Sequence, residues 1–408
     1  MPTLLQINVT ANWGSTGRIA EDIGRTAIEH GWDSYIAYGR YVSPSQSRLI
    51  KVGNKYDAYA HYLRNRLFDG EGLGSQHATR RLIGQIKDLS PDIIHLHNIH
   101  DHWLNYPILF EYLAGADTPV VWTQHDHWAL TGHCCYIPSG CEKWRTSCCD
   151  CPLQKKKLFD RSRRNYLQKK ELFASLKSLT LVPVSEWLGT QVLESFYKGC
   201  DIKVIHNGID IEMFSPQISN VRFKYDIDGK KIVLGVASEW STRKGLDDFY
   251  KLAQLLPEEY IIIIIGKILG KRNDINGASY KMRFIDRTQN AQELAQLYSA
   301  AMVFVNPTYQ DNYPTTNLEA MSCGTPVITY RTGGSPEAIT PETGWVVEQG
   351  NIHSIAKIIM KLAQMNEGER FAQRKACRER AVKFFNKNER FEEYIKLYEA
   401  LIKESKNQ

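Results

Sequence analysis

The stretch Tyr260–Gly266 (YIIIIIG) limits the possible folds more than any other part of this sequence. A membrane-spanning helix needs about 20 apolar residues, so this run is far too short to cross a bilayer. β-Branched residues favour extended structure, and a strand that is apolar at every position is buried on both faces. Such strands occur in parallel sheets that helices cover on both sides, and the stretch therefore predicts an α/β architecture.

Strand-like and helix-like segments alternate along the chain in two series. The first series contains predicted strands at 3–10, 32–39, 91–100, 118–126 and 179–185, with a helix at 19–31. The second contains strands at 230–238, 260–266, 302–308 and 325–330, with helices at 245–257, 291–301 and 315–324. Two series predict two Rossmann-like domains. We expect an N-terminal domain over 1–205 with a cysteine-rich insert at about 133–152, a second domain over 206–385, and an amphipathic C-terminal helix over 386–408.

The bulk composition indicates a globular protein without a nucleic-acid partner. Apolar residues make up 43% of the 408 residues, which is typical of globular domains with full cores. The formal charge of +6 is modest, so no nucleic-acid partner is expected. The first 15 residues lack a basic leader with an apolar core, and we expect a cytoplasmic protein with mostly reduced cysteines.

Two carboxylates, Asp311 and Glu319, lie around a predicted helix start just after a predicted strand. Ligands of open α/β sheets bind beyond the carboxyl ends of the strands. Pro314 suits the first turn of the helix and Gly324 suits its end. Carboxylates can accept hydrogen bonds from sugar hydroxyls, and helix-start amides favour phosphate. The alternative is an acid that complements the helix dipole and another that pairs with a surface base.

The segment DNYPTTNLEAMSCGTPVI (311–328) resembles the carboxylate-x7-carboxylate signature of retaining glycosyltransferases of the GT-B fold, family four. It departs from the usual glutamate–glycine at Asp311 and Asn312. The RTGGSPEAI and HNGID segments continue the resemblance, which covers nearly the whole chain. It implies two Rossmann-like domains that face each other across a cleft, with the C-terminal helix returning to the N-terminal domain.

The resemblance also implies a donor site for a nucleotide-diphospho-sugar. Lys244 matches the lysine that holds the diphosphate and Arg243 lies beside it, whereas Glu239 replaces an arginine found in the family. Gly14 and Gly17 match the glycine turn of the first domain. The full set of expected donor-binding residues is Gly14, Gly17, Arg243, Lys244, Asn312, Thr315, Thr316, Asn317 and Glu319.

Histidines are concentrated at the ends of two predicted strands. His95 and His97 share a strand face and could bind a metal, or one histidine could line the site while the others are ordinary polar residues. The resemblance assigns an orienting role toward sugar or acceptor to His125, with Asp126 beside it. We therefore expect His125, Asp126, Asp311 and Glu319 to be the catalytic residues.

The resemblance implies transfer with retention, in which a donor phosphate oxygen takes the acceptor proton on the front face. No metal or other cofactor is then required for catalysis. The alternative mechanism uses Asp101 or Asp126 as base or nucleophile.

The expected enzyme moves a hexose from a UDP- or GDP-sugar to a saccharide acceptor, with lipid-linked acceptors favoured. The expected process is bacterial surface polysaccharide synthesis: capsule, exopolysaccharide or O-antigen. A non-catalytic or hydrolytic sugar-nucleotide-binding protein of the same fold is the alternative. A GT-B epimerase also shares the fold, whereas a phosphorylase needs a much longer chain.

Six of the nine cysteines lie between Cys134 and Cys151. A structural zinc site is one interpretation, and its expected ligands are Cys134, Cys141, Cys148 and Cys151. Two other interpretations are reduced thiols in a tight insertion and disulfides. A similar insert occurs in a subset of bacterial polysaccharide glycosyltransferases, which favours a structural role.

The segment Lys155–Lys170 carries eight basic residues and one acid, interleaved with Leu158, Phe159, Tyr166 and Leu167. One interpretation is a solvated helix face. The other is an interfacial helix that meets anionic lipid, which would place the protein at the inner face of the plasma membrane.

Overall fold

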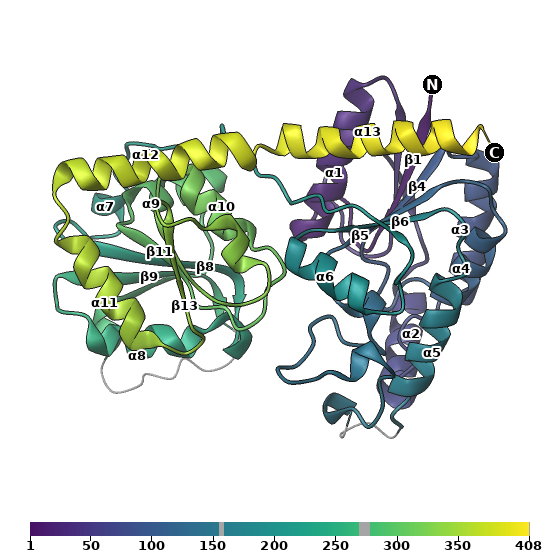
Figure 1. Cartoon of the computed structure of the whole chain (residues 1–408), viewed down its shortest axis with the longest axis horizontal. Coiled ribbons are helices and arrows are strands. Elements are labelled where there is room, and N and C mark those ends of the chain that lie inside the picture. The colour runs from purple at the N-terminus through teal and green to yellow at the C-terminus, as the bar shows by residue number, and fades with distance from the viewer. Residues whose placement is uncertain (155–158, 269–277, 408) are drawn as a thin grey trace. The chain divides into compact units, whose positions relative to one another are not determined.

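The computed structural model describes residues 1–154, 159–268 and 278–407, and it divides the chain into two compact units (Figure 1). One unit combines 1–205 with 391–408, and the other is 206–390. Each unit is built on one parallel sheet with helices packed on it. The predicted fold class of two Rossmann-like domains is confirmed.

The first unit contains a seven-stranded sheet in the order β3-β2-β1-β4-β5-β6-β7. The order reverses direction between β1 and β4, which creates the switch point where such folds bind ligands. The strands are β1 (Thr3–Asn8), β2 (Asp33–Tyr38), β3 (Arg48–Lys51), β4 (Ile93–Leu96), β5 (Val120–Gln124), β6 (Leu179–Pro183) and β7 (Asp201–Ile202).

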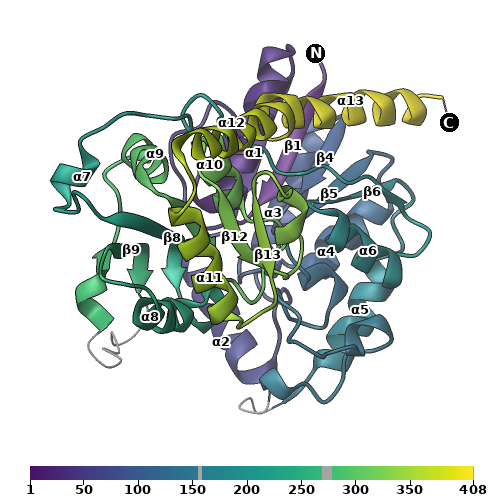
Figure 2. The same cartoon turned by 60° about the vertical axis from the view of Figure 1, so that its left-hand side comes forward.

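The second unit contains a six-stranded sheet in the order β10-β9-β8-β11-β12-β13 (Figure 2). The isoleucine run forms most of β9 and is buried throughout, as predicted. Predicted strand 302–308 is shorter, because Pro307 follows β11 and has no N–H for the ladder. The strands are β8 (Lys231–Trp240), β9 (Tyr260–Ile268), β10 (Met282–Ile285), β11 (Val303–Asn306), β12 (Val327–Tyr330) and β13 (Gly344–Val347).

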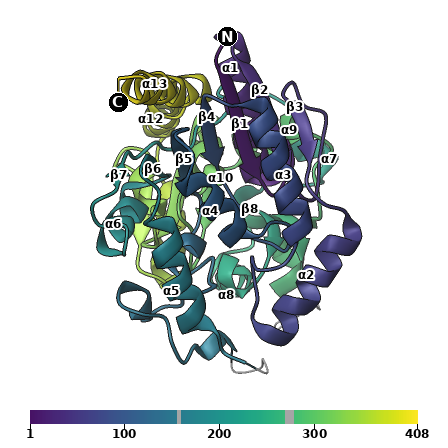
Figure 3. The ribbon, with the colours of Figure 1, turned by 90° about the vertical axis from the view of Figure 1, so that its right-hand side faces the viewer.

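Helices connect the parallel strands, and in Figure 3 α3, α4 and α5 cross in front of the first sheet. The first unit contains α1 (Gly14–Glu29), α2 (Lys55–Phe68), α3 (Gln76–Leu89), α4 (Tyr106–Ala114), α5 (Ser162–Phe173) and α6 (Glu186–Glu194), with 3-10 turns η1 (Trp128–Leu130), η2 (Lys143–Arg145) and η3 (Pro152–Gln154). The second contains α7 (Val221–Lys224), α8 (Leu246–Leu255), α9 (Ala291–Ala300), α10 (Thr315–Ser322), α11 (Ile352–Ala363) and α12 (Glu367–Phe384), with η4 (Thr242–Lys244), η5 (Ala278–Lys281) and η6 (Ser335–Ala338).

The last helix, α13 (Lys387–Ser405), completes the core of the first unit. Phe391, Tyr394, Ile395 and Tyr398 are buried against residues of α1 and of strands β1, β4, β5 and β6. Full burial of one such side chain contributes about 1.5–3 kcal/mol to stability. The chain end is therefore an integral part of the first unit. Among the described residues, no helix is long and apolar enough to cross a membrane.

Candidate active site

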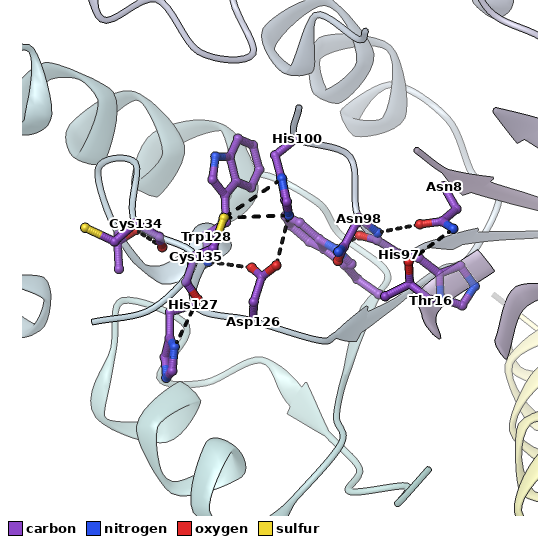
Figure 4. Close-up of polar contacts among 12 residues, drawn as sticks. Asn8, Thr16, His97, Asn98, His100, Asp126, His127, Trp128, Cys134 and Cys135 are labelled. Carbon is purple, nitrogen blue, oxygen red and sulfur yellow. Dashed lines mark hydrogen bonds and ion pairs between the residues drawn. The ribbon is translucent and has the colours of Figure 1, made fainter. Parts of the chain in front are cut away.

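In the first unit, polar side chains gather beyond the ends of β1, β4 and β5. These three strands are neighbours in the sheet and run parallel, so the residues that follow them meet at one edge. Asn8 ends β1 and its Oδ1 accepts the amide of Asn98 after β4, at 3.1 Å. His97 also follows β4, and His125 follows β5. Figure 4 shows part of this cluster.

His125 is held by a chain of hydrogen bonds that starts inside the sheet. Its Nε2 lies 3.1 Å from Nδ1 of His97, and Nε2 of His97 lies 3.0 Å from Oε1 of Gln6. The Gln6 amide oxygen accepts, so His97 carries its proton on Nε2 and His125 donates from Nε2. Burial lowers the pKa of His125 to about 4, and burial also lowers the pKa of His97 well below its usual value. Both imidazoles are therefore neutral near pH 7.

Asp126 forms a buried ion pair with His100 (Figure 4). Oδ2 of Asp126 lies 2.9 Å from Nε2 of His100, and Oδ1 accepts the amide of Trp128 at 2.8 Å. Burial opposes both charges, but the mutual attraction prevails: the pKa of Asp126 is lowered and that of His100 is raised well above its usual value. Both oxygens of this predicted catalytic carboxylate therefore already accept hydrogen bonds.

Asp101 and His95 belong to structural networks of their own. Asp101 has a positive φ of 81° and pairs with Nη1 of Arg40 at 2.6 Å. His95 is fully buried, with Nε2 2.8 Å from the hydroxyl of Thr123 and Nδ1 2.6 Å from that of Tyr398. These contacts favour the ordinary-polar interpretation of His95 over the metal-ligand one.

The predicted glycine turn is the first turn of α1, five residues before the expected helix start. Gly14 has a φ of 69°, a conformation that favours glycine. A Cβ on Gly17 would lie 2.6 Å from Oγ1 of Thr10, so the helix start packs closely on the preceding loop. No acidic residue lies in this first turn and no side chain caps it, which is compatible with an approaching anion.

In the second unit, the expected phosphate-binding residues lie on η4, directly after β8. Gly245 ends this turn with a φ of 76°, and a Cβ there would lie 2.1 Å from the carbonyl oxygen of Pro307. The η4 turn is thereby packed against the segment that follows β11. Glu239, which replaces the family's arginine, is exposed on β8.

Lys244 and Asp311 form an ion pair, with Nζ 2.6 Å from Oδ2. Their side chains are 22% and 15% exposed, so the pair is largely shielded but can still be reached by solvent. Next to it, Nη1 of Arg243 donates to the carbonyl of Gln310 at 2.8 Å. The two cations after β8 and the first acid of the signature therefore form one cluster.

Glu319 lies in α10, where its Oε2 accepts the hydroxyl of Tyr298 at 3.1 Å. Tyr298 lies in α9 and is fully buried. Burial and the nearby carboxylate raise the pKa of this phenol well above its usual value, so it stays a donor. Nothing in the sequence pattern singles out Tyr298 as a partner of Glu319.

The remaining signature residues divide into two groups. Thr315 and Thr316 are partly exposed in the first turn of α10, which has no acidic residue and no side-chain cap. Asn317 is fully buried and tied to Asn306 at 2.8 Å and to Ser335 at 3.0 Å, and Asn312 is also buried. Asn317 thus joins α10 to the end of β11 and to η6.

Residues of the cysteine-rich insert line a pocket in the first unit. All four predicted zinc ligands line this pocket, together with His133. All nine cysteines lie in the described part of the chain and none forms a disulfide. Lys155, Lys156, Lys157 and Leu158 of the basic segment lie outside the described residues.

Comparison with known proteins identifies the class. A family model described as Glycosyltransferase Family 4 matches residues 16–213, and one described as Glycosyl transferases group 1 matches residues 217–384. Together they span both units. The chain therefore belongs to the family four glycosyltransferases of the GT-B fold, and it is a glycosyltransferase.

Individual relatives agree with this class. A putative colanic acid biosynthesis glycosyl transferase, WcaC, of Escherichia coli K12 is 26% identical over 98% of this chain and 100% of its own length. The sucrose-phosphate synthase of Thermosynechococcus elongatus has a TM-score of 0.72 at 17% identity, over 98% of this chain and 99% of that one. Anabaena HepE, solved in complex with UDP, has a TM-score of 0.70 at 15% identity, over 98% and 100%. At such identities the two structures support the fold alone.

Proposed function

We propose that this protein is a retaining, metal-independent glycosyltransferase. It transfers a hexose from a nucleotide-diphospho-sugar to a saccharide on a lipid carrier during synthesis of a bacterial surface polysaccharide. The Lys244–Asp311 pair beside Arg243 carries the proposal. The WcaC relative, with its printed role in colanic acid biosynthesis, supports the polysaccharide assignment.

The ion pair suits the linkage of a nucleotide-diphospho-sugar. In such a donor the β-phosphate is bonded directly to the anomeric carbon, so a phosphate oxygen and a sugar hydroxyl lie a few bonds apart. When the donor binds, it breaks the ion pair: Lys244 then binds the phosphate oxygen, and Asp311 accepts a hydrogen bond from the sugar hydroxyl. The leaving diphosphate gains negative charge as the glycosidic bond breaks, and Lys244 with Arg243 stabilises that charge.

The start of α10 and Glu319 supply the remaining donor contacts. Thr315, Thr316 and the first-turn amides face a diphosphate or sugar oxygen, whereas Glu319 accepts hydroxyls of the nucleotide's ribose. Tyr298 fixes the Glu319 carboxylate at 3.1 Å and thereby orients it. Asn312 and Asn317 have a positioning role, because both are buried in the wall of the site. Gly14 and Gly17 lie in the first unit, where the uncapped start of α1 offers amides to a phosphate oxygen.

The first unit supports a front-face mechanism without a protein nucleophile. Asp126 already pairs with His100 and accepts the Trp128 amide, and Asp101 pairs with Arg40. Neutral His125 donates from Nε2 to His97, which fixes its ring for contact with sugar or acceptor hydroxyls. The acceptor hydroxyl forms the new bond to the anomeric carbon, its proton passes to a donor phosphate oxygen, and the nucleotide diphosphate leaves.

A surface of the first unit supports a lipid-linked acceptor at the inner face of the plasma membrane. Helix α2 buries a single residue, His61, and exposes a row of large apolar side chains. Tyr56 is 73% and Tyr59 63% exposed. Lys55, Arg64 and Arg66 are exposed on the same helix. Exposed rings flanked by cations are typical of interfacial helices that meet anionic lipid.

The basic segment adjoins this helix. Phe68, at the end of α2, stacks on Phe159 with ring centroids 6.1 Å apart. Arg163, Arg164 and Leu167 are exposed on α5. We call α2 together with the exposed residues of 159–170 the lipid-facing surface.

A donor screen tests the proposed activity. Purified protein is incubated with UDP- and GDP-sugars, with and without lipid-linked saccharides extracted from bacterial membranes, and release of UDP or GDP is measured. Release that depends on the acceptor supports transfer. Acceptor-independent release identifies the hydrolytic alternative, and binding without release identifies the non-catalytic one.

A further inference from the structure

The cysteine-rich insert brings a histidine and two thiols into the geometry of a metal site. A ring nitrogen of His133 and the sulfur atoms of Cys134 and Cys151 all lie within 4.8 Å of one another. Nε2 of His133 is 3.3 Å from Sγ of Cys151. Zinc binds sulfur at about 2.3 Å and nitrogen at about 2.0 Å, so two ligands of a tetrahedral site lie about 3.5–3.8 Å apart. The three side chains are thus already near the required spacing.

A fourth sulfur lies on the same pocket. Cys148 lines it together with the other three, and its Sγ accepts the amide of Gly132 at 3.3 Å. Cys148 and Cys151 form a C-x-x-C pair, a spacing that metal-binding loops commonly use. Gly132 is required at its position, because a Cβ there would lie 2.5 Å from the carbonyl oxygen of Ser162.

The surroundings of His133 and Cys148 match those of bound metals. Nδ1 of His133 lies 3.9 Å from Oδ2 of Asp69, whose side chain is fully buried. Metal-binding histidines generally direct their second nitrogen toward a carboxylate, which fixes the ring. Nζ of Lys169 is buried on the carbonyls of Trp128 and Thr131, at 2.7 and 3.0 Å, and interacts electrostatically with Cys148. Zn²⁺ with three thiolates has a charge of –1, which this ammonium balances.

We propose that His133, Cys134, Cys148 and Cys151 bind one structural zinc ion that clamps the loop following β5. The assignment replaces Cys141 of the sequence prediction with His133. His133 is grouped with Cys134 and Cys151, and its Nδ1 lies near the carboxylate of Asp69. Four protein ligands leave no open position, so the ion is structural and not a catalyst.

The adjacent Cys135 connects this zinc site to the residues beside His125. Its carbonyl accepts the amide of His127 at 3.0 Å, and its sulfur lies 3.9 Å from Nε2 of His100 (Figure 4). One peptide bond separates Cys134 from Cys135. Zinc bound to Cys134 therefore holds the far end of the loop against His127 and the His100–Asp126 pair.

Metal analysis of the full-length protein tests the site. Native mass spectrometry and elemental analysis should find one zinc per chain in protein purified without chelator. His133→Asn, Cys134→Ser and Cys151→Ser should each reduce the zinc content at least tenfold. The matched controls are Cys149→Ser, which lines the same pocket outside the proposed set, and Cys141→Ser, and both should keep one zinc.

Two results would overturn the assignment. Wild-type protein that neither contains zinc nor takes up added Zn²⁺ or Co²⁺ has no such site, and this result does not depend on any variant folding. Loss of zinc in Cys141→Ser with retention in His133→Asn would replace the proposed ligands with the four-cysteine set. Cobalt-substituted protein gives an independent readout, since the intensity of its thiolate charge-transfer band reports three sulfurs or four.

Hydrogen exchange tests the clamp. Removal of zinc with a chelator should increase amide exchange at least tenfold at His127 and across residues 125–135. Amides of β9 in the second unit serve as the internal control and should not change. Unchanged exchange at His127 after verified zinc loss would contradict the clamp.

Discussion

Nζ of Lys244 lies 2.6 Å from Oδ2 of Asp311, which joins the expected phosphate-binding lysine to the first acid of the family signature. The two residues come from different segments, one after β8 and one after β11. A shielded ion pair of this kind holds both side chains in place before the ligand arrives. The proposed function uses this arrangement, in which Asp311, shorter than the family's glutamate, binds the donor.

The first prediction concerns this pair. Lys244→Met should lower kcat/KM at least 100-fold, because it removes a charge that stabilises the leaving diphosphate, an effect of about 3 kcal/mol. Asp311→Asn should lower it less, about tenfold, since the amide keeps a hydrogen-bonding oxygen. Steady-state release of nucleotide diphosphate provides both values.

A second ion pair in the same unit serves as the control. Nζ of Lys231 lies 2.7 Å from Glu259 on the surface, and Lys231→Met should leave kcat/KM unchanged. If Lys244→Met and Asp311→Asn lower thermal stability but leave nucleotide affinity and turnover intact, the pair is structural only.

The second prediction separates Glu319 from the residue that orients it. Glu319→Gln should raise the KM for the donor at least tenfold, because a charged acceptor of ribose hydroxyls is lost. Tyr298→Phe removes the hydrogen bond to Glu319 and should raise KM a few-fold with little change in kcat, at a stability cost of about 1 kcal/mol. Donor titrations at saturating acceptor measure both.

Tyr330→Phe is the matched control for Tyr298→Phe. Its hydroxyl donates to Asp248 at 2.8 Å, so the substitution also removes a buried phenol–carboxylate hydrogen bond. It should cost similar stability without changing KM. Equal KM effects from the two substitutions would argue against an orienting role for Tyr298.

The third prediction concerns pH and His125. Its pKa is about 4 in the folded chain because of burial, against about 6.5 when unfolded. Between these values the unfolded chain binds a proton that the folded chain does not, so stability falls as pH drops from 6.5 to 4. His125→Gln should reduce the loss of unfolding free energy over that window by up to about 3 kcal/mol, which is measured as a smaller fall in melting temperature. His61, His95 and His97 maintain a residual slope, because burial lowers the pKa of each of these histidines as well.

His100 should have the opposite effect on the pH dependence of stability. Its pKa is raised in the folded chain, since the pair with Asp126 outweighs burial. The stability from this imidazolium is present below pH 6.5 and is lost as the pH rises through its folded pKa. His100→Gln should therefore destabilise most at about pH 6 and progressively less at higher pH. Identical pH dependence of the two variants would contradict the assigned protonation states.

The fourth prediction concerns the lipid-facing surface. Wild-type protein should bind vesicles containing phosphatidylglycerol, and binding should weaken with salt. Tyr59→Ser combined with Phe68→Ser should weaken it at least tenfold, since each buried ring contributes about 1–2 kcal/mol. Neutralising Lys155, Lys156 and Lys157 should reduce its salt dependence. Vesicle co-sedimentation measures both effects.

Phe371→Ser controls for general loss of apolar surface. Phe371 is 70% exposed in the second unit, and its replacement should leave vesicle binding unchanged. Binding of the wild type to neutral vesicles with the same affinity would contradict the electrostatic part of the account.

The sequence predicts the central strands of both sheets, because a strand buried on both faces, such as β9, is apolar along most of its length. It does not predict the edge strands β3, β7, β10 and β13, which are short. It also predicts the start of α10 at Thr315 and its end before Gly324, which has a φ of 75°. Pro314 is the N-cap residue, one position before the first turn in which the sequence predicts it. No helix is predicted over Lys55–Phe68, since aromatic residues all along α2 hide any apolar stripe.

The contacts within the site could not be predicted from the sequence. The approach of Lys244 to Asp311 depends on the pairing of β8 with β11 and on the close packing at Gly245. The His97–His125 bond likewise depends on β4 and β5 being neighbours, which periodicity does not specify. His133 stands next to a cysteine in the sequence, but only the tertiary structure brings it to Cys151 and Asp69.

The anomeric configuration of the product tests the central claim most directly. NMR spectra are recorded during the reaction of an α-linked UDP- or GDP-sugar with a lipid-linked saccharide, with wild-type protein and with Lys244→Met. The account predicts loss of the donor's anomeric signal, formation of an α-linked product and free nucleotide diphosphate with the wild type, and almost no product with the variant. A β-linked product, or equal turnover by Lys244→Met, would contradict it.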